Sequence, residues 1–234
     1  MKAKNMYLVN LVASIPLFKG LSLEHCRNLA DIVVDSVFSR GQNIFSEGDE
    51  GNGFYVVISG RVKIYKLSPE GKEQILHIFG SGEPFGEVPV FAGERFPAHA
   101  EAIEESRIFF FPRDSFVELI KKNPSLALNM LAVLSRRLRK FTVLIEDLSL
   151  KEVPSRLSAY LLHMSRANNK STDLVLDISK GQLASILGTI PETLSRILKK
   201  MTKEGLIRSE GTRHLRILDR EGVEDLACGA RKLT

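Results

Sequence analysis

Cysteine is scarce in this sequence. Its 234 residues include only Cys26 and Cys228, and there is no tryptophan. The two cysteines lie far apart and in no C-x-x-C arrangement, so they supply too few ligands for a zinc site or an iron–sulfur cluster. A free cysteine mostly behaves as a small hydrophobic residue. We therefore expect no cysteine-based metal site and no disulfide framework.

Long apolar runs are missing as well. No stretch approaches the roughly 20 apolar residues that cross a bilayer. The beginning of the chain, with Lys2, Lys4 and Asn5, has too short an apolar run for a signal peptide. These absences predict a cytoplasmic protein with no membrane partner. The composition, 44% hydrophobic and 26% charged, is that of a globular protein, and the length suits two domains.

The net charge of +5 is concentrated in the last third of the chain. Residues 1–150 contain 18 Lys and Arg against 18 Asp and Glu, whereas residues 151–234 contain 15 against 10. A basic domain joined to a neutral one suggests that the basic domain meets a polyanion.

Residues 36–111 are predicted to form β structure. Glycines separate short apolar runs such as Phe54–Ile58 and Arg61–Tyr65, and the second run alternates with the period of a half-buried strand. Many short strands with turn signals imply a closed or double-sheet structure. A helical flank around Leu17–Val33 is expected to pack against it.

A long amphipathic helix is expected from Pro124 to about Leu148. Its apolar residues follow the 3,4,3,4,3 spacing of a two-stranded coiled coil, which predicts a homodimer. The alternative is a single helix packed on its own domain. Arg136, Arg137, Arg139 and Lys140 are predicted to face outward. The predicted dimer seam consists of Leu131, Leu134, Leu138, Phe141, Ile145 and Leu148.

A hinge is expected at Asp147–Leu150, because Val153-Pro154 follows and a proline disfavours helix in the residue before it. The predicted fold class is α+β. Its parts are a β domain at 1–123, a dimerisation helix at 124–150 and a basic C-terminal domain at 151–234.

The most informative stretch is Ser179–Met201. Ser179 can cap a helix, Gly188 can take the positive φ of a tight turn, and Pro191 suits the first turn of a second helix. Two short helices joined by a glycine turn form a helix-turn-helix, whose second helix enters the major groove. The inner stripe of that second helix is predicted to be Leu194, Ile197, Leu198 and Met201.

The outer face of the second helix is predicted to bind DNA. Arg196 can pair with O6 and N7 of a guanine, and Glu192 can accept from a cytosine amino group. Thr193 and Ser195 lie on the same face, and Lys199, Lys200 and Lys203 are candidates for phosphate contacts. A β-hairpin at Gly205–Leu218 is interpreted as the wing, with Arg213 and His214 near its tip.

At this point the chain resembles the cyclic-AMP receptor protein and fumarate–nitrate regulator (CRP/FNR) family over almost its whole length. The matching segments are the glycine-punctuated β-roll, Gly82–Glu87 in the position of the phosphate cassette, the long helix, and Ile178–Ile207. The resemblance implies that 1–123 is a β-roll effector-sensing domain of the cyclic-nucleotide-binding-like type and that 151–234 is a winged helix-turn-helix domain. It also implies a palindromic operator and RNA polymerase as a partner. Glu192–Arg196 resembles the fumarate–nitrate regulator branch, which implies TTGA-like half-sites rather than TGTGA-like ones.

The resemblance also locates an effector pocket. In cyclic-nucleotide-binding relatives, Gly-Glu is followed by Arg-Ser/Thr-Ala, which holds the phosphate and ribose. Here Gly86-Glu87 is present, but the second element is Phe96-Pro97-Ala98, and Arg95 is one residue out of register. The charge that would pair with the phosphate of cyclic AMP is missing, which argues against cyclic AMP as the effector. The predicted pocket consists of Phe85, Gly86, Glu87, Val88, Phe96, Pro97, Ala98 and His99.

The degenerate cassette resembles that of the heme-dependent nitric-oxide and nitrosative-stress regulators (the Dnr and HcpR types). Heme would need an axial ligand, and His99 is the first of the candidates His25, His77, His99, His163 and Met130. The iron–sulfur branch is disfavoured, because Cys26 is alone in that region.

Two alternatives from other functional classes are a protein-interaction module and an enzyme. The winged helix could serve protein–protein interaction instead of DNA binding. An enzyme has no support, since the sequence shows no nucleophile elbow, no Walker loop and no metal-ligand spacing.

Overall fold

The computed structural model describes residues 2–211 and 213–233. The chain divides into two compact units, Met1–Arg139 and Lys140–Thr234. The division falls within the long helix α5 (Ser125–Leu150). Each unit is described by itself.

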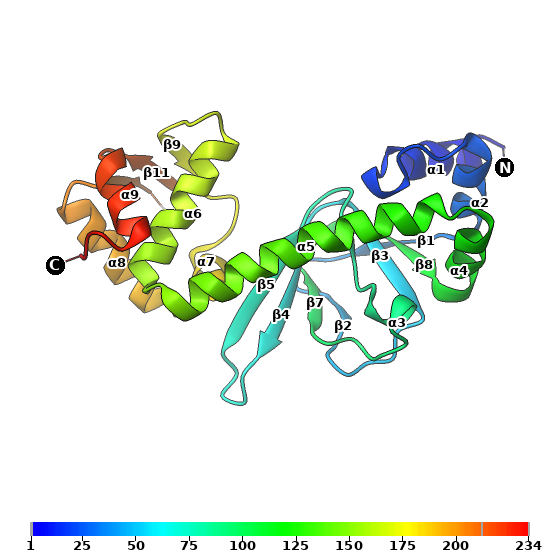
Figure 1. Cartoon of the computed structure of the whole chain (residues 1–234), viewed down its shortest axis with the longest axis horizontal. Coiled ribbons are helices and arrows are strands. Elements are labelled where there is room, and N and C mark those ends of the chain that lie inside the picture. The colour runs from blue at the N-terminus through cyan, green and yellow to red at the C-terminus, as the bar shows by residue number, and fades with distance from the viewer. Residues whose placement is uncertain (1, 212, 234) are drawn as a thin grey trace. The chain divides into compact units, whose positions relative to one another are not determined.

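The first unit is built on two four-stranded antiparallel sheets (Figure 1). One sheet has the strand order β1-β8-β3-β6 and the other β2-β7-β4-β5. This arrangement confirms the predicted double-sheet β structure. The strands are β1 (Val34–Phe38), β2 (Asn43–Phe45), β3 (Gly53–Ser59), β4 (Val62–Leu67), β5 (Glu73–Phe79), β6 (Pro84–Phe85), β7 (His99–Ala102) and β8 (Ser106–Pro112).

Strands β3 and β8 bury both of their faces, which explains their continuous apolar runs. Val57 and Ile108 belong to the core between the two sheets. Phe54 and Phe109 belong to a second core, which the same sheet forms with the helices. Residues on alternate sides of a strand thus serve different cores.

Helices cover the outer face of the β1-β8-β3-β6 sheet (Figure 1). They are α1 (Lys2–Ser14), the 3₁₀ helix η1 (Pro16–Phe18), α2 (Leu23–Ile32), α4 (Arg113–Lys122) and the beginning of α5. Ser22 caps α2 by accepting from the backbone N–H of His25 at 3.2 Å. Asn129 on α5 donates to the carbonyl oxygen of Leu17 at 3.0 Å. The N-terminal flank therefore packs on the β unit as predicted.

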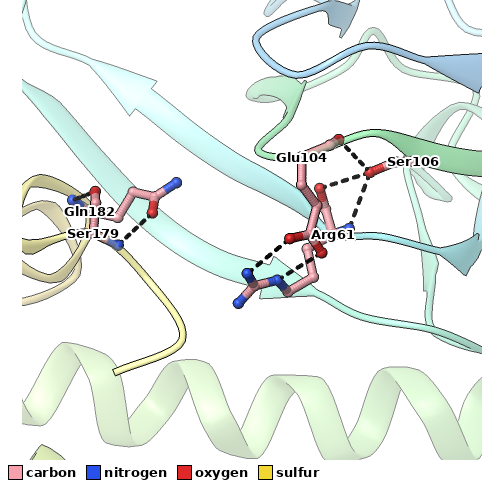
Figure 2. A network of polar contacts seen from close by, with 5 residues as sticks. All are labelled: Arg61, Glu104, Ser106, Ser179 and Gln182. Atoms are coloured by element: carbon pink, nitrogen blue, oxygen red, sulfur yellow. Dashed lines mark hydrogen bonds and ion pairs between the residues drawn. The ribbon is translucent and has the colours of Figure 1, made fainter. Parts of the chain in front are cut away.

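A polar network fixes the turn between β3 and β4 (Figure 2). Arg61 makes two 3.0 Å hydrogen bonds with the carboxylate of Glu104, and its backbone N–H donates to the fully buried Ser106 hydroxyl at 3.0 Å. Gly60 precedes this network with φ of 82°, where a Cβ would lie 2.4 Å from the carbonyl oxygen of Glu105. Only glycine fits this turn without strain.

The second unit contains the helices α6, α7, α8 and α9 and a small sheet of order β10-β11-β9. Helix α6 (Val153–Ala167) lies alongside α9 (Arg220–Cys228) (Figure 1). Between them come β9 (Asp173–Val175), α7 (Lys180–Ile186), α8 (Pro191–Lys203), β10 (Ile207–Glu210) and β11 (His214–Ile217). Strands β10 and β11 pair antiparallel and form the predicted hairpin.

Within residues 2–211 and 213–233, none of the helices combines the length and apolar character needed to cross a membrane.

Candidate nucleic-acid interface and effector region

Helices α7 and α8 are joined by the turn that the sequence predicted. Ser179 and Gln182 form a capping box at the start of α7: the Ser179 hydroxyl accepts from Gln182 N–H at 3.1 Å, and the Gln182 side chain accepts from Ser179 N–H at 2.9 Å (Figure 2). Gly188 has φ of 65°. Pro191 occupies the first position of α8, where a backbone N–H would have no intrahelical partner and its absence costs nothing.

The inner and outer faces of α8 are also as predicted. Leu194, Ile197, Leu198 and Met201 are all buried. Glu192, Arg196, Lys199 and Lys200 are exposed, whereas Thr193 and Ser195 are half-buried. The helix therefore presents a polar, mainly basic face that is held in place by its apolar stripe.

This outer face has little internal pairing. In the described part of the chain, neither Arg196 nor Lys199 nor Lys200 takes part in an ion pair. The side chain of Arg196 contacts Thr193, whose Oγ1 accepts from Nη2 at 3.2 Å. In the wing, Arg213 is exposed and its carbonyl oxygen accepts from Leu176 N–H at 2.8 Å. These cations are available to phosphate groups.

In the first unit, the apolar members of the expected effector pocket pack into the core between the sheets. Phe96 stacks on Phe45 with ring centroids 3.7 Å apart, and Phe85 stacks on Tyr55 at 5.2 Å. Gly86 has φ of 71°, and a Cβ there would lie 3.2 Å from three of these rings. The glycine of the cassette thus allows the aromatic rings to approach the backbone closely.

The cassette carboxylate of Glu87 is buried and paired with Arg137 on α5. The Arg137 Nη1 lies 2.7 and 2.8 Å from the two Glu87 oxygens, and its Nη2 donates to the carbonyl oxygen of Pro84. The guanidinium also lies over the ring of Phe79, 4.7 Å from its centroid. The side chains are only 7% (Glu87) and 15% (Arg137) exposed. This pair links the cassette directly to the long helix.

The prediction that Arg137 faces outward is therefore wrong. Arg136, Arg139 and Lys140 are exposed as predicted. Arg137 directly precedes Leu138 of the expected seam, on the flank of α5 that meets the β unit. A buried glutamate needs a cation nearby. The cation of Glu87 is Arg137, which lies 50 positions away in the sequence, so only the folded structure identifies it.

The remaining members of the expected pocket are Val88, Pro97, Ala98 and His99. Val88 begins α3 (Val88–Phe91) and is half-buried, and Ala98 is buried. The carbonyl oxygen of Pro97 accepts from Lys66 at 3.0 Å. His99 alternates with the buried Ala100 along β7 and so lies on the opposite, outer face of the sheet.

His99 and Arg95 both have partners within the first unit. His99 stacks on Tyr65 at 5.1 Å, and its Nδ1 accepts from Glu47 N–H at 3.3 Å. Arg95 pairs with the exposed Glu50 at 2.6 Å and donates to the Gly48 carbonyl oxygen. The out-of-register arginine is therefore engaged by the neighbouring loop.

The expected dimer seam on α5 has two kinds of residue. Leu131, Leu138 and Ile145, which are seven residues apart, are 58%, 69% and 65% exposed. Leu134, Phe141 and Leu148 are half-buried, and Leu134 packs against the helical core of its own unit. The chain therefore carries an exposed apolar row with a heptad period along α5.

The expected hinge is helical through Leu150, and α6 begins at Val153. Arg156 holds this junction, since its Nη1 donates at 3.1 Å to the carbonyl oxygens of both Leu148 and Lys151. Burial lowers the pKa of Arg156, and its Nε is buried without a hydrogen-bond partner. No sequence pattern indicates this role, because an arginine early in a helix usually faces solvent.

The candidate heme ligands are dispersed. Met130 is fully buried in the helical core, and His163 is exposed. His77 packs edge-on against Phe79, and His25 Nδ1 lies 3.0 Å from the side-chain nitrogen of Asn123. Within the described residues, no three His, Cys, Asp or Glu side chains are grouped so that they could hold a metal ion.

A double-sheet β domain, a long helix and a winged helix-turn-helix together define a DNA-binding transcription regulator. Residues 36–123 match the cyclic nucleotide-binding domain, and residues 155–226 match the Crp-like helix-turn-helix domain. A cyclic AMP receptor protein from Thermus thermophilus is 32% identical over 215 residues, which are 92% of this chain and 97% of that protein.

More distant relatives also match this chain over most of its length. The fumarate and nitrate reduction regulatory protein of Escherichia coli is 27% identical over 90% of this chain and 86% of its own. A variant of CooA from Carboxydothermus hydrogenoformans shares the fold with a TM-score of 0.75 at 23% identity, covering 94% of this chain and 95% of that one. The chain belongs to the CRP/FNR family of transcription regulators.

Proposed function

We propose that the protein is a homodimeric, effector-responsive regulator that reads a palindromic DNA site through α8. The observation that carries this proposal is the exposed outer face of α8 above a fully buried apolar stripe. In the major groove, Arg196 would pair with a guanine and Glu192 with a cytosine amino group. Lys199, Lys200 and Arg213 would contact phosphates and fix the register.

Selection of the full-length protein on random DNA tests this proposal. We expect a palindrome with TTGA-like half-sites whose centres are about one helical turn, roughly 34 Å, apart. R196A and E192A should each lose about 1–3 kcal/mol of discrimination at one base pair. K232A removes an exposed charge outside α8 and the wing and is the matched control. Operator binding by R196A and E192A that equals the parent's would refute the proposal.

Protein–protein interaction through the winged helix is the alternative. The two functions differ in their dependence on salt, because each neutralised phosphate releases counterions and contributes about −0.9 to the slope of log K against log[salt]. A steep slope that becomes shallower by about one in K199A supports DNA binding. RNA polymerase is a further partner that the family resemblance implies, and co-sedimentation with the operator complex tests it.

Dimerisation is proposed through the exposed row of Leu131, Leu138 and Ile145. Such a row would leave three large apolar side chains in water, and pairing with a second copy buries them. The two-fold symmetry of the pair would match the palindrome. Sedimentation of the full chain at micromolar concentration tests this directly.

The effector is proposed to differ from cyclic AMP. Phe96 and Pro97 replace the Arg-Ser/Thr that holds phosphate and ribose in nucleotide-binding relatives, and Phe96 stacks on Phe45. Calorimetric titration with cyclic AMP should give no binding heat at millimolar ligand. Binding in the micromolar range would overturn this part of the proposal.

The heme-dependent branch is the specific effector class that the degenerate cassette suggests. Its test is an absorption spectrum of the protein with and without added heme. A Soret band that shifts with nitric oxide would place the chain in that branch. No band would exclude heme and direct the search to organic effectors. Since His99 lies on the outer face of the sheet, H99A alone should leave such a band unchanged if an interior ligand holds the heme.

A further inference from the structure

The exposed side chain of Arg196 makes a hydrogen bond to a neighbour on its own helix. Its Nη2 donates to Thr193 Oγ1 at 3.2 Å, and the two residues are neighbours at i and i+3 on α8. Arg196 has no other polar contact in residues 2–211 and 213–233. An arginine without such a contact would sample many rotamers, each of which points the guanidinium in a different direction.

The base of this contact is rigid. Leu194 directly follows Thr193, and Ile197 directly follows Arg196. These two apolar side chains are 0% and 8% exposed, so they anchor this part of α8 in the core. The branched Cβ of threonine limits the rotation of its side chain within a helix. The acceptor oxygen of Thr193 is therefore confined to the two rotamers that threonine favours within a helix.

The contact leaves the arginine able to read a base. A guanidinium has five N–H donors, and Thr193 takes one of them. Two donors on one edge are enough for the O6 and N7 of a guanine. An arginine that is already oriented loses less conformational freedom on binding, so it binds more tightly than a mobile one.

We propose that Thr193 is a positioning residue that sets the orientation of Arg196 before DNA is bound, and so determines how sharply guanine is selected. This inference rests on the proposed function. Its consequence is specific: loss of the hydroxyl should weaken binding to the operator and leave binding to random DNA unchanged.

The test is a double-mutant cycle in the full-length protein, with T193V and R196A and the operator selected by the parent. Valine has the shape of threonine without the hydroxyl. T193V should weaken operator binding about three- to tenfold and reduce discrimination against the operator whose guanine is replaced by adenine. In the R196A background, T193V should cause no further loss. T193S, which restores the hydroxyl, should bind as the parent does.

T202V is the matched control. Thr202 lies on the same helix, and its hydroxyl donates to the Leu198 carbonyl oxygen at 2.9 Å. It should leave base discrimination unchanged.

Two outcomes would overturn the inference while leaving the proposed function intact. One is an equal loss for T193V on operator and random DNA, which would indicate a direct phosphate contact by Thr193. The other is the same loss for T193V with and without Arg196. If R196A itself binds the operator as the parent does, the proposed function fails first, and the two failures are thereby distinguished.

Discussion

Removing the guanidinium of Arg137 should destabilise the first unit more than any other single charge deletion on α5. R137A would leave the Glu87 carboxylate, whose side chain is 7% exposed, without its cation. Truncating one partner of a buried ion pair costs about 3–5 kcal/mol, because the other charge stays out of water. The lost contact with Phe79 is part of that cost. Since whole domains are stable by only about 5–15 kcal/mol, a large fraction of the unit should unfold at moderate urea concentrations.

Urea unfolding followed by circular dichroism measures this effect. R136A is the control, because Arg136 is the preceding residue, carries the same charge and is exposed. It should change the free energy of unfolding by no more than about 0.5 kcal/mol. E87Q/R137M removes both charges and should recover most of the loss, since no buried charge remains. A cost for R137A within about 1 kcal/mol of that for R136A would refute the view that this pair is buried and matched.

Three further predictions concern other parts of the molecule. L138E places a charge in the exposed row of α5, so sedimentation should show a monomer, and operator affinity should fall at least tenfold; a dimer would contradict the proposed seam. F96A removes a ring stacked on Phe45 and should cost about 3–5 kcal/mol in urea unfolding; a near-neutral result would mean that the site is not packed. Hydrogen bonding from Arg61 lowers the pKa of Glu104, so the pair stabilises the fold above about pH 4.3 and ceases to do so as the pH falls through the lower folded value. E104Q should accordingly lower the urea midpoint at pH 7, and its difference from the parent should shrink as the pH falls below about 4.3; a loss that does not change with pH would point to packing instead.

The helix-turn-helix was predictable because its signals are local. Ser179, Gly188 and Pro191 each fix one end of a helix within a few residues, and the apolar period of α8 distinguishes its two faces. The double sheet was predictable for a similar reason, since glycines separate its short strands.

The effector region was less predictable because its contacts are distant in sequence. An apolar pocket and an apolar core have the same composition, so Phe85 and Phe96 fit either interpretation until their rings are seen to stack on Tyr55 and Phe45. Arg137 sits beside the seam of α5, where helical periodicity does not distinguish solvent from the flank of the β unit. Its partner Glu87 could be assigned only from the fold.

The same ion pair gives a route by which the cassette and α5 influence each other. Glu87 directly precedes α3, and Arg137 directly precedes the exposed Leu138 on α5. If binding of DNA by a dimer favours one position of α5, the coupling must be reciprocal, and the cassette must respond. Hydrogen exchange of the amides of residues 86–91 should therefore change when the parent binds its operator. In E87Q/R137M, which lacks the pair and is expected to keep the fold, the operator should still bind and this change should be absent. The same change in both proteins would show that the coupling takes another path.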